Sequence, residues 1–238
     1  MPTIRGAARR AYGIGRDLTF TKLLPRILDT RFVVDGREYD YLWHPFESTW
    51  RSERAVEIPI GLAELRNADP RRTLEIGNVL RKYTSPPARH LVVDRYEHAP
   101  GVINADALTY SGGPYDLIVS ISTLEHIGYD EEPRDAARAV RAVEHLRGLL
   151  RPEGTMLATI PIGYNRDLDD ALRDGSLDAR VSHLARTGRL RWEQLDAETS
   201  RAIYGLPWPG AGVAYGWPWP GANVLAVARL TPPQAPAG

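Results

Sequence analysis

The chain has 238 residues, with 30 basic and 30 acidic side chains and no cysteine. This length suits one large domain or two small ones. The absence of cysteine excludes disulfides, thiolate zinc sites and cysteine nucleophiles. A formal charge of zero argues against nucleic acid as the main partner, because phosphate binding favours a basic surplus. The apolar stretches are too short to span a bilayer, and no signal peptide is evident, so we expect a cytoplasmic protein without membrane partners.

The first part of the chain, residues 1–66, is predicted to be an N-terminal arm with helices. Its first 35 residues are basic and interrupted by glycine and proline, so we expect them to be loosely attached. Residues 48–65 have helical character, with a restart or kink at Pro59, because a proline inside a helix loses one hydrogen bond. The aromatic residues of 39–46, with His44, either form a lid over a site or pack in the core.

Strands and helices alternate in the centre of the chain. Strands are predicted at 73–77, 90–94, 102–103, 115–120 and 155–160, and the clearest helix at 133–150. The helix carries apolar residues at every third or fourth position, which gives one buried stripe. Strands separated by helical connections imply an α/β fold with a mostly parallel sheet covered on both faces.

The last quarter of the chain differs in composition. Residues 163–200 are polar and are predicted to be helical. Residues 206–223 contain Pro-Trp-Pro-Gly-Ala twice and are predicted to be a loop, because proline is excluded from helices and central strands. This loop either walls a sugar or aromatic substrate or packs against the sheet edge. Residues 223–229 read as a final strand, and 231–238 as a disordered tail.

The residues that follow the predicted strands carry a resemblance. In chain order the segments at and near these strands are Leu74-Glu-Ile-Gly77, Asp94, Asp106-Ala-Leu108, Tyr115-Asp-Leu-Ile-Val-Ser120 running into Glu125-His-Ile127, and Leu149-Leu-Arg-Pro-Glu-Gly154 before a strand. Over about residues 70–162 this order resembles the class I S-adenosylmethionine-dependent methyltransferases. The resemblance implies a Rossmann-like sheet with a C-terminal antiparallel strand, a core domain over 67–230, and S-adenosylmethionine as the cofactor.

The resemblance also implies which residues contact the cofactor: Glu75, Gly77, Asn78, Asp94, Asp106, Ala107, Ser120 and Ile121. Gly77 lets the backbone approach a ligand that a Cβ would block. Asp94 can accept from both ribose hydroxyls, as acids do in dinucleotide sites. Glu75 would accept from the cofactor's ammonium, and Asp106 from its adenine amino group. The alternatives are a buried, paired acid at Glu75 and turn or capping residues at Asp94 and Asp106.

Two features depart from the family pattern. The family's first loop usually has two or three glycines, whereas only Gly77 is present here, so the next three residues must turn differently. Only 12 residues separate Gly77 from His90, and seven separate Asp94 from Val102. The second connection is too short for a crossover helix, so we expect a loop there and a sheet with shortened crossovers.

His126 is the candidate catalytic base, because neutral imidazole can take a proton from a hydroxyl or an amine. Glu125 is expected to orient His126 or to pair with an arginine. Tyr164 and Asn165 follow the last predicted parallel strand and are, with His44, the candidate substrate residues. The alternatives are a packed or loop-capping histidine and a plain turn. No histidine spacing matches a metal-binding motif, so no metal site is predicted.

These residues predict methyl transfer to an oxygen or nitrogen of a small molecule, such as a sugar, nucleoside or secondary metabolite. The alternative is a non-catalytic nucleotide-binding or partner-binding protein on the same fold, which the missing glycines suggest. A dehydrogenase is disfavoured, because no Gly-x-Gly-x-x-Gly follows the first strand. The sequence makes no prediction about the oligomeric state.

Overall fold

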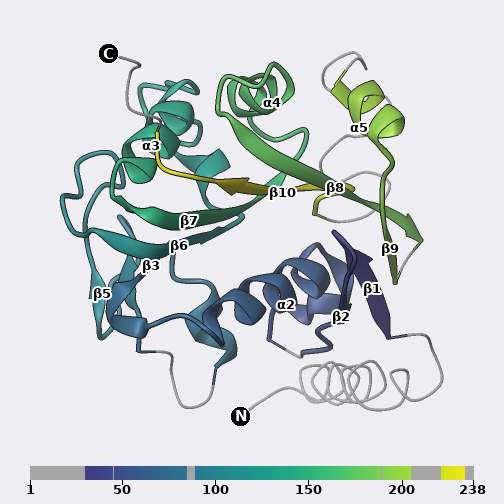
Figure 1. The fold of residues 1–238 in the computed structure, drawn as a ribbon, viewed down its shortest axis with the longest axis horizontal. Coiled ribbons are helices and arrows are strands. Elements are labelled where there is room, and N and C mark those ends of the chain that lie inside the picture. The colour runs from purple at the N-terminus through teal and green to yellow at the C-terminus, as the bar shows by residue number, and fades with distance from the viewer. Residues whose placement is uncertain (1–29, 45, 85–88, 189, 205–220, 234–238) are drawn as a thin grey trace, which may run out of the picture.

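The computed structural model describes residues 30–44, 46–84, 89–188, 190–204 and 221–233. An eight-stranded sheet in the order β5-β4-β3-β6-β7-β10-β8-β9 runs through them (Figure 1). Its parallel strands are β3 (Thr73–Ile76), β4 (Leu91–Val93), β5 (Val102–Ile103), β6 (Tyr115–Ile121) and β7 (Leu150–Pro161). The antiparallel strands are β10 (Val224–Leu230), β8 (Ala179–Gly188) and β9 (Arg191–Gln194). This confirms the predicted α/β sheet with an antiparallel C-terminal strand.

Helices cover both faces of this sheet (Figure 1). Helix α2 (Arg54–Leu65) lies on one face, and α3 (Arg138–Arg147), α4 (Arg166–Arg173) and α5 (Ala197–Tyr204) contribute to the other. Each face has its own apolar cluster: on β6, Ile118 belongs to the cluster with α3, and Val119 to the cluster with α2. Successive residues of a strand point to opposite faces, so continuous apolar runs such as β6 mark strands that are buried on both sides.

Residues 31–34 form a strand, so the prediction of a loosely attached arm is wrong for this stretch. Strands β1 (Arg31–Val34) and β2 (Arg37–Asp40) pair as a hairpin around Asp35 and Gly36, which both have positive φ. An Asp-Gly pair favours this tight two-residue turn. The first 29 residues lie outside the described residues. The domain boundary at residue 66 stays a prediction; α2 shares its cluster with the sheet.

Two tyrosines of the aromatic segment 39–46 pack in the interior. Tyr39 and Tyr41 are buried, and the Tyr41 ring lies 5.1 Å from that of Phe32. The Tyr41 hydroxyl accepts from the Trp192 backbone N–H at 2.8 Å and so ties this segment to β9. For Tyr39 and Tyr41 these contacts correspond to the core alternative, whereas Phe46 is exposed.

Pro59 lies inside α2, and the helix continues through it without a restart, so of the two predicted outcomes only a kink stays a prediction. A proline cannot donate to the carbonyl four residues earlier, which here belongs to Ala55. That carbonyl instead accepts from the backbone N–H of Leu42 at 2.9 Å. A contact from outside the helix therefore satisfies the group that the proline leaves free.

Two other predictions of local structure were wrong. The predicted helix at 133–150 is shorter, and the strand predicted at 155–160 begins earlier, because β7 starts at Leu150 and runs through Pro152 and Gly154. Residues 163–200 contain β8 and β9 as well as two short helices. The polar side chains of β8 find distant partners: Ser182 donates to Asp35 at 2.5 Å, and Arg186 donates to the Arg51 carbonyl at 2.9 Å.

The short crossovers are confirmed. A 3₁₀ helix (Leu80–Tyr83) is the one helical element described between β3 and β4, and residues 85–88 of that connection are not described. Between β4 and β5 the chain is a loop. The Pro-Trp-Pro-Gly-Ala segment falls largely outside the described residues, as does the end of the predicted tail.

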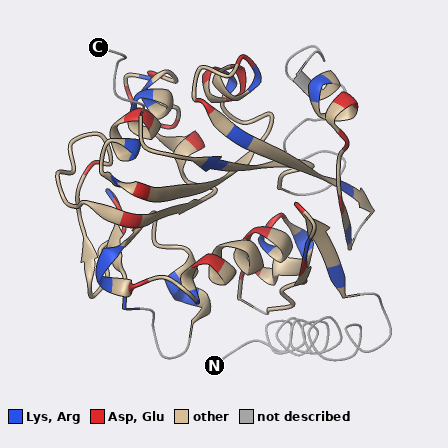
Figure 2. Ribbon diagram, in the orientation of Figure 1, with Lys and Arg blue, Asp and Glu red and all other residues tan. Residues whose placement is uncertain are grey.

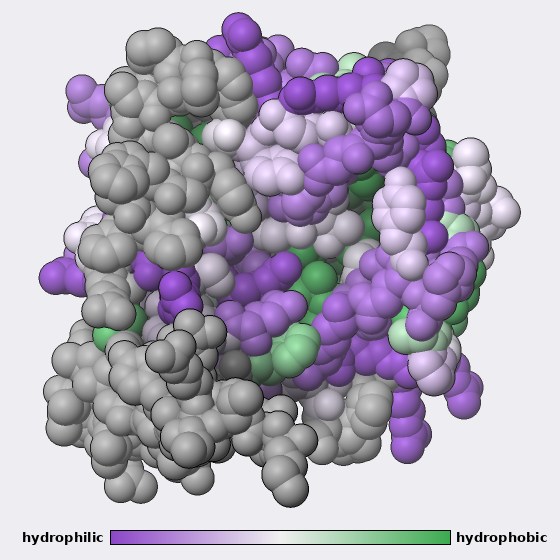
Figure 3. Space-filling view, turned by 180° about the vertical axis from the view of Figure 1, so that it is seen from behind, coloured by the Kyte–Doolittle hydropathy of each residue, from purple (hydrophilic) through white to green (hydrophobic). Residues whose placement is uncertain are grey.

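Charged residues of both signs are interspersed over the helices and strands that the structure describes (Figure 2). Seen from behind, the described surface is mostly hydrophilic, with small apolar areas between the polar side chains (Figure 3). In the described part of the chain, no helix has the length and apolar character to cross a membrane. The same residues hold no group of three or more histidine or acidic side chains suited to a metal ion.

Candidate functional site

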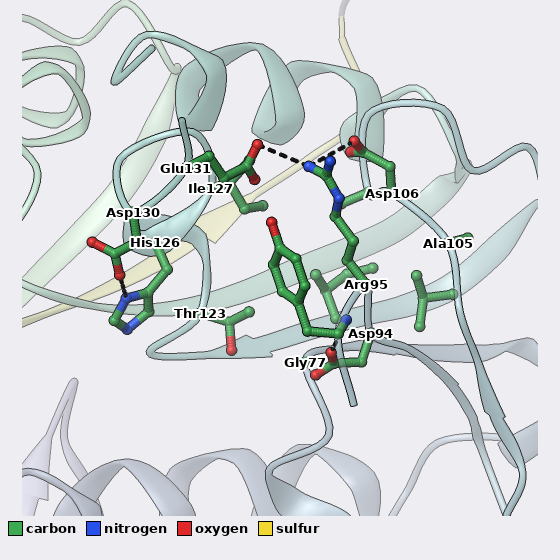
Figure 4. Close-up of a pocket in the computed structure, with 14 residues that line it drawn as sticks. Gly77, Asp94, Arg95, Ala105, Asp106, Thr123, His126, Ile127, Asp130 and Glu131 are labelled. Carbon is green, nitrogen blue, oxygen red and sulfur yellow. Dashed lines mark hydrogen bonds and ion pairs between the residues drawn. The ribbon is translucent and has the colours of Figure 1, made fainter. Parts of the chain in front are cut away.

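A cavity of about 320 Å³ lies at the carboxyl ends of the parallel strands, where open α/β sheets bind ligands (Figure 4). Its volume is in the range of small-molecule sites. The apolar part of its wall is formed by Ile76, Val93, Ala105, Ala107 and Ile127. The other lining residues are Gly77, Asp94, Arg95, Tyr96, Asp106, Thr123, His126, Asp130 and Glu131. The cavity therefore combines apolar surface with charged side chains that approach it from several sides (Figure 4).

Gly77 forms the bottom of the cavity at the end of β3. Its φ is +83°, a conformation that residues with a Cβ rarely adopt. A Cβ at this position would also overlap the side chain of Thr123, which lines the cavity from the loop after β6. Both the backbone conformation and the close approach of two loops therefore require glycine here.

Glu75 shapes the turn that replaces the glycine-rich loop. Its side chain is fully buried, and one oxygen accepts from the N–H groups of Val79 at 2.8 Å and Leu80 at 2.5 Å. The other oxygen lies 2.6 Å from Nε2 of His90. The carboxylate thus holds the start of the 3₁₀ helix in place of the missing glycines. This placement favours the alternative of a buried, paired acid, with an imidazole and two amides as its partners.

Asp94 lines the cavity and also organises the loop after β4. One oxygen accepts from the N–H groups of Tyr96 and Glu97, at 2.9 and 2.8 Å, and the other accepts from the N–H of Asn78 at 3.2 Å. A carboxylate oxygen can accept more than one hydrogen bond, so the second oxygen keeps capacity for a ligand hydroxyl. Among the described residues Oδ1 of Asn78 has no partner, which leaves a buried acceptor beside Asp94.

Asp106 and Ala107 line the cavity at the end of β5. The Asp106 carboxylate accepts from the Leu108 N–H at 3.0 Å and from the guanidinium of Arg138, and it lies 3.3 Å from Arg95. Arg95 also binds Glu131 at 2.8 Å, so it links the two sides of the cavity (Figure 4). These bonds give Asp106 a role in closing the wall, and they favour the alternative of a turn residue over a contact with adenine.

Ser120 and Ile121 do not line the cavity. Ser120 is buried and donates to the Ile76 carbonyl at 3.2 Å, and Ile121 packs in the cluster with α2. The chain reaches the cavity two residues later, at Thr123. Between them Ser122 has a positive φ of 39°, and its hydroxyl donates to Glu57 of α2 at 2.5 Å. The loop after β6 is therefore anchored to α2.

His126 lies at the end of a 3₁₀ helix (Leu124–His126), and its side chain is partly exposed at the cavity. Its Nδ1 lies 2.6 Å from a carboxylate oxygen of Asp130, as Figure 4 shows. The Tyr164 ring meets the imidazole edge to face, with 4.7 Å between the ring centroids. The Tyr164 hydroxyl donates to Asp130 at 2.9 Å. The structure thus brings two predicted site residues together through an acid that the sequence analysis did not single out.

Glu125 points away from the solvent. It is fully buried, one of its oxygens lies 3.6 Å from Nε2 of His126, and the other has no partner among the described residues. Burial raises the pKa of Glu125 well above its ordinary value, with nearby Glu57 adding to the effect. The raised pKa favours a neutral carboxyl group beneath the imidazole.

Asn165 and His44 lie away from the cavity wall. Asn165 is completely buried: its side chain accepts from the Leu168 N–H at the start of α4 and donates to the Glu125 carbonyl at 3.0 Å. This is the helix-capping geometry of a turn residue. His44 accepts from the Phe46 N–H at 3.1 Å and stacks edge to face against Tyr83. Both placements favour local structural roles for these two residues.

Nine of the residues that line the cavity were not predicted as site residues from the sequence: Ile76, Val93, Arg95, Tyr96, Ala105, Thr123, Ile127, Asp130 and Glu131. Most of them lie at the end of a strand or just after it. The rule that ligands bind at strand ends therefore points to the segment but not to the individual residues in it. Asp130 has a more specific signal, because it lies four residues after His126. In a helical turn that spacing places two side chains next to each other.

No family model and no curated protein matches this sequence. Solved structures resemble it weakly. N-methyltransferase NodS from Bradyrhizobium japonicum, bound to S-adenosyl-L-homocysteine, is 14% identical over 68% of this chain and 78% of its own, with a TM-score of 0.39. A TehB-like SAM-dependent methyltransferase from Corynebacterium glutamicum is 16% identical over 73% and 88%, with a TM-score of 0.40. Precorrin 8W decarboxylase from Methanobacterium thermoautotrophicum is 13% identical over 74% and 90%, with a TM-score of 0.39. These values are too low to assign an activity to the chain.

Proposed function

We propose that this protein is an S-adenosylmethionine-dependent methyltransferase that acts on an oxygen or nitrogen of a small molecule, such as a sugar, nucleoside or secondary metabolite. The observation that carries the proposal is the cavity at the carboxyl ends of β3 and β4, with the Gly77 turn at its bottom and Asp94 on its wall. The order of motifs in the sequence, which resembles class I methyltransferases, supports it.

The residues of the cavity fit the adenosine part of such a cofactor. Ile76, Val93 and Ala107 offer apolar surface for the adenine ring, and Asp94 keeps an acceptor for the ribose hydroxyls. Gly77 lines the cavity with backbone atoms alone, and the Thr123 side chain lies where a Cβ would point. The cofactor supplies a methyl group that is already activated on a sulfonium, so the protein contributes mainly proximity and orientation.

His126 supplies the base in this proposal. It lines the cavity beside Thr123, and a neutral imidazole there takes the proton that a hydroxyl or amine acceptor gives up. A general base of this kind typically contributes about 10²–10⁴-fold to a rate. Glu125 lies 3.6 Å from Nε2 of the imidazole, and its raised pKa favours a carboxyl group that is neutral there.

The choice of a small-molecule acceptor rests on the balance of charge and on the size of the cavity. Figure 2 shows no described helix or strand that carries a long run of one sign, which a nucleic-acid surface would need. A small-molecule partner and a cytoplasmic location remain predictions.

Titration calorimetry with S-adenosylmethionine and S-adenosylhomocysteine tests the proposal. We expect both to bind, and we expect Asp94→Ala to weaken binding by about tenfold or more, as the loss of a charge-assisted hydrogen bond of ~1.5–3 kcal/mol implies. The matched control is Asp116→Ala, because Asp116 lies at the opposite end of β6 with its side chain 44% exposed. No heat at millimolar cofactor would exclude the methyltransferase.

One observation favours a second candidate, a protein that binds a nucleotide without turnover. Both oxygens of Glu75 are engaged within the protein, so the described residues at the end of β3 offer no free carboxylate for the ammonium of an amino-acid tail. The same calorimetry separates the two functions when adenosine is included. Adenosine binding as tightly as S-adenosylhomocysteine would support the nucleotide-binding protein, whereas much weaker binding of adenosine would support the methyltransferase.

A further inference from the structure

We propose that Asp130 is a positioning residue that holds the His126 ring with its proton on Nδ1, so that Nε2 is the basic atom of the ring. The assignment of the tautomer rests on geometry alone. Its use in methyl transfer rests on the proposed function.

The contact between the two side chains is short and local. Asp130 follows His126 by four residues, and its backbone N–H donates to the His126 carbonyl at 3.2 Å, which closes one turn. This turn places Oδ2 of Asp130 2.6 Å from Nδ1 of His126 (Figure 4). An ionised carboxylate can only accept, so Nδ1 carries the proton and donates it to this bond.

Tyr164 holds the pair from a second element, the connection between β7 and α4. Its hydroxyl donates to both oxygens of Asp130, at 2.9 and 3.2 Å, and its ring packs edge to face on the imidazole. The carboxylate is therefore fixed from two sides. A carboxylate that is fixed in this way sets both the tautomer and the orientation of a histidine ring.

Three other described histidines show the opposite tautomer. Nδ1 of His44 accepts from the Phe46 N–H, so its proton is on Nε2. Nε2 of His145 lies 2.8 Å from the Tyr110 carbonyl, which can only accept, and Nε2 of His90 faces the Glu75 carboxylate. His126 differs from all three in carrying its proton on Nδ1, and it is also the one of the four that lines the cavity at the strand ends.

Nε2 of His126 has no hydrogen bond of its own within the described residues. The closest acid to it, Glu125, is 3.6 Å away, which is beyond hydrogen-bond distance. In the transfer, an acceptor atom would attack the methyl carbon while the carbon–sulfur bond breaks and its electron pair stays on sulfur. The proton of the acceptor would pass to Nε2, and the carboxylate of Asp130 would stabilise the imidazolium that forms.

The test uses the full chain with ¹⁵N-labelled histidine and no cofactor. Nitrogen chemical shifts distinguish protonated from unprotonated ring nitrogens, and His126→Gln assigns the signals. At a pH where the imidazole is neutral, we expect His126 to be protonated on Nδ1 and His145 on Nε2. In Asp130→Asn, we expect the His126 signals to move toward a mixture of tautomers while those of His145 stay unchanged. The proposal would be overturned if His126 of the wild type is protonated on Nε2, or if the His126 signals of Asp130→Asn are the same as those of the wild type.

A reactivity measurement shows whether the pair makes Nε2 a better base, which a merely structural contact would not. Diethyl pyrocarbonate modifies the unprotonated ring nitrogen, and mass spectrometry follows each histidine. We expect Asp130→Asn to lower the rate at His126 several-fold, Tyr164→Phe to lower it less, and His145 to be unaffected. An equal rate at His126 in wild type and Asp130→Asn would overturn the role.

Both readouts are independent of the cofactor. If calorimetry shows no binding of S-adenosylmethionine while the tautomer is as expected, the proposed function fails and the Asp130–His126 assignment stands. If the cofactor binds and the tautomer is the opposite one, only the assignment fails.

Discussion

The two halves of the sheet use the same eight-stranded frame for different purposes. In the parallel half, β3, β4, β5 and β6 all end at the same edge, and their following loops surround the cavity. In the antiparallel half, which begins where β10 pairs with β7, the strands β10, β8 and β9 reverse direction at each step, so their ends alternate between the two edges. A binding site that draws on several strand ends can form only where those ends coincide.

Polar side chains reflect the same difference. In the parallel half Asp94 holds its loop and still faces the cavity. In the antiparallel half Arg186 is buried and donates to the carbonyls of Arg51 and Trp50, which ties β8 to the N-terminal segment. The first arrangement leaves capacity for a ligand, and the second one stabilises the packing of distant segments. The three predictions that follow test this division.

The largest effect is expected from Glu57→Ala. Glu57 is fully buried and binds Arg54 at 2.7 Å, the Ser122 hydroxyl at 2.5 Å and the Thr159 hydroxyl at 3.0 Å. Removing one partner of a buried pair typically costs about 3–5 kcal/mol. Since Ser122 begins the loop that carries Thr123 to the cavity, we also expect weaker cofactor binding. Urea denaturation and calorimetry measure the two effects.

Arg186→Met is the matched variant in the antiparallel half. It removes hydrogen bonds from a charged donor, which are worth about 1.5–3 kcal/mol each, and we expect it to leave cofactor affinity unchanged. If Arg186→Met weakened binding as much as Glu57→Ala does, the division between the two halves would be refuted.

The next effect depends on pH and concerns Asp169 in α4, between the two halves. Burial raises its pKa to about 7, although the Gly163 N–H that it accepts lowers it in part. A pKa that is higher in the folded than in the unfolded state means that the folded state binds more protons between about pH 4 and pH 7. Stability is therefore lost as the pH rises through this window.

Asp169→Asn keeps an acceptor for Gly163 and removes the titration. Between about pH 4 and pH 8, we expect the free energy of unfolding of the variant to rise by about 2–4 kcal/mol relative to that of the wild type. One pKa unit corresponds to ~1.4 kcal/mol. Free energies of unfolding from urea titrations at the two pH values measure this difference. An unchanged difference between variant and wild type would show that Asp169 does not titrate in this range.

The smallest effect on stability is expected from Gly77→Ala, with Gly175→Ala as its control. Both glycines have positive φ, +83° and +77°, so each substitution strains the backbone by about 1–2 kcal/mol. A Cβ at Gly175, before β8, meets no atom within 4 Å, whereas one at Gly77 overlaps Thr123. We expect both variants to lose stability and only Gly77→Ala to weaken cofactor binding, by about tenfold. Equal cofactor affinity in the two variants would show that Gly77 does not belong to the cofactor site.

The sequence predicted the strands of the parallel half because burial on both faces makes them continuously apolar, as in the run from Leu117 to Val119. It failed for β8, where Ser182 and Arg186 read as surface residues. Their partners, Asp35 and the Arg51 carbonyl, are more than 130 positions away in the chain. A polar residue gives no local sign that a distant group will satisfy it.

The same contrast holds for the site. Gly77, Asp94, Asp106, Ala107 and His126 line the cavity, as expected of residues that follow parallel strands. Glu75, inside β3, and Asn165, after β7, also lie near strand ends, but they are buried and bind neighbouring loops. Which of two residues at a strand end faces a ligand depends on the course of the loop, and sequence position alone does not specify it.

The sequence by itself determined the α/β class, the edge of the sheet at which a site forms, and the absence of thiol chemistry, because these follow from periodicity, chain direction and composition. The tertiary structure decided the rest. It placed Asp130 and Tyr164 around His126, tied Ser122 to α2, and completed the sheet with polar strands. The physical reason is that hydrogen bonds and burial are satisfied between segments that are far apart in the chain, and only folding brings those segments together.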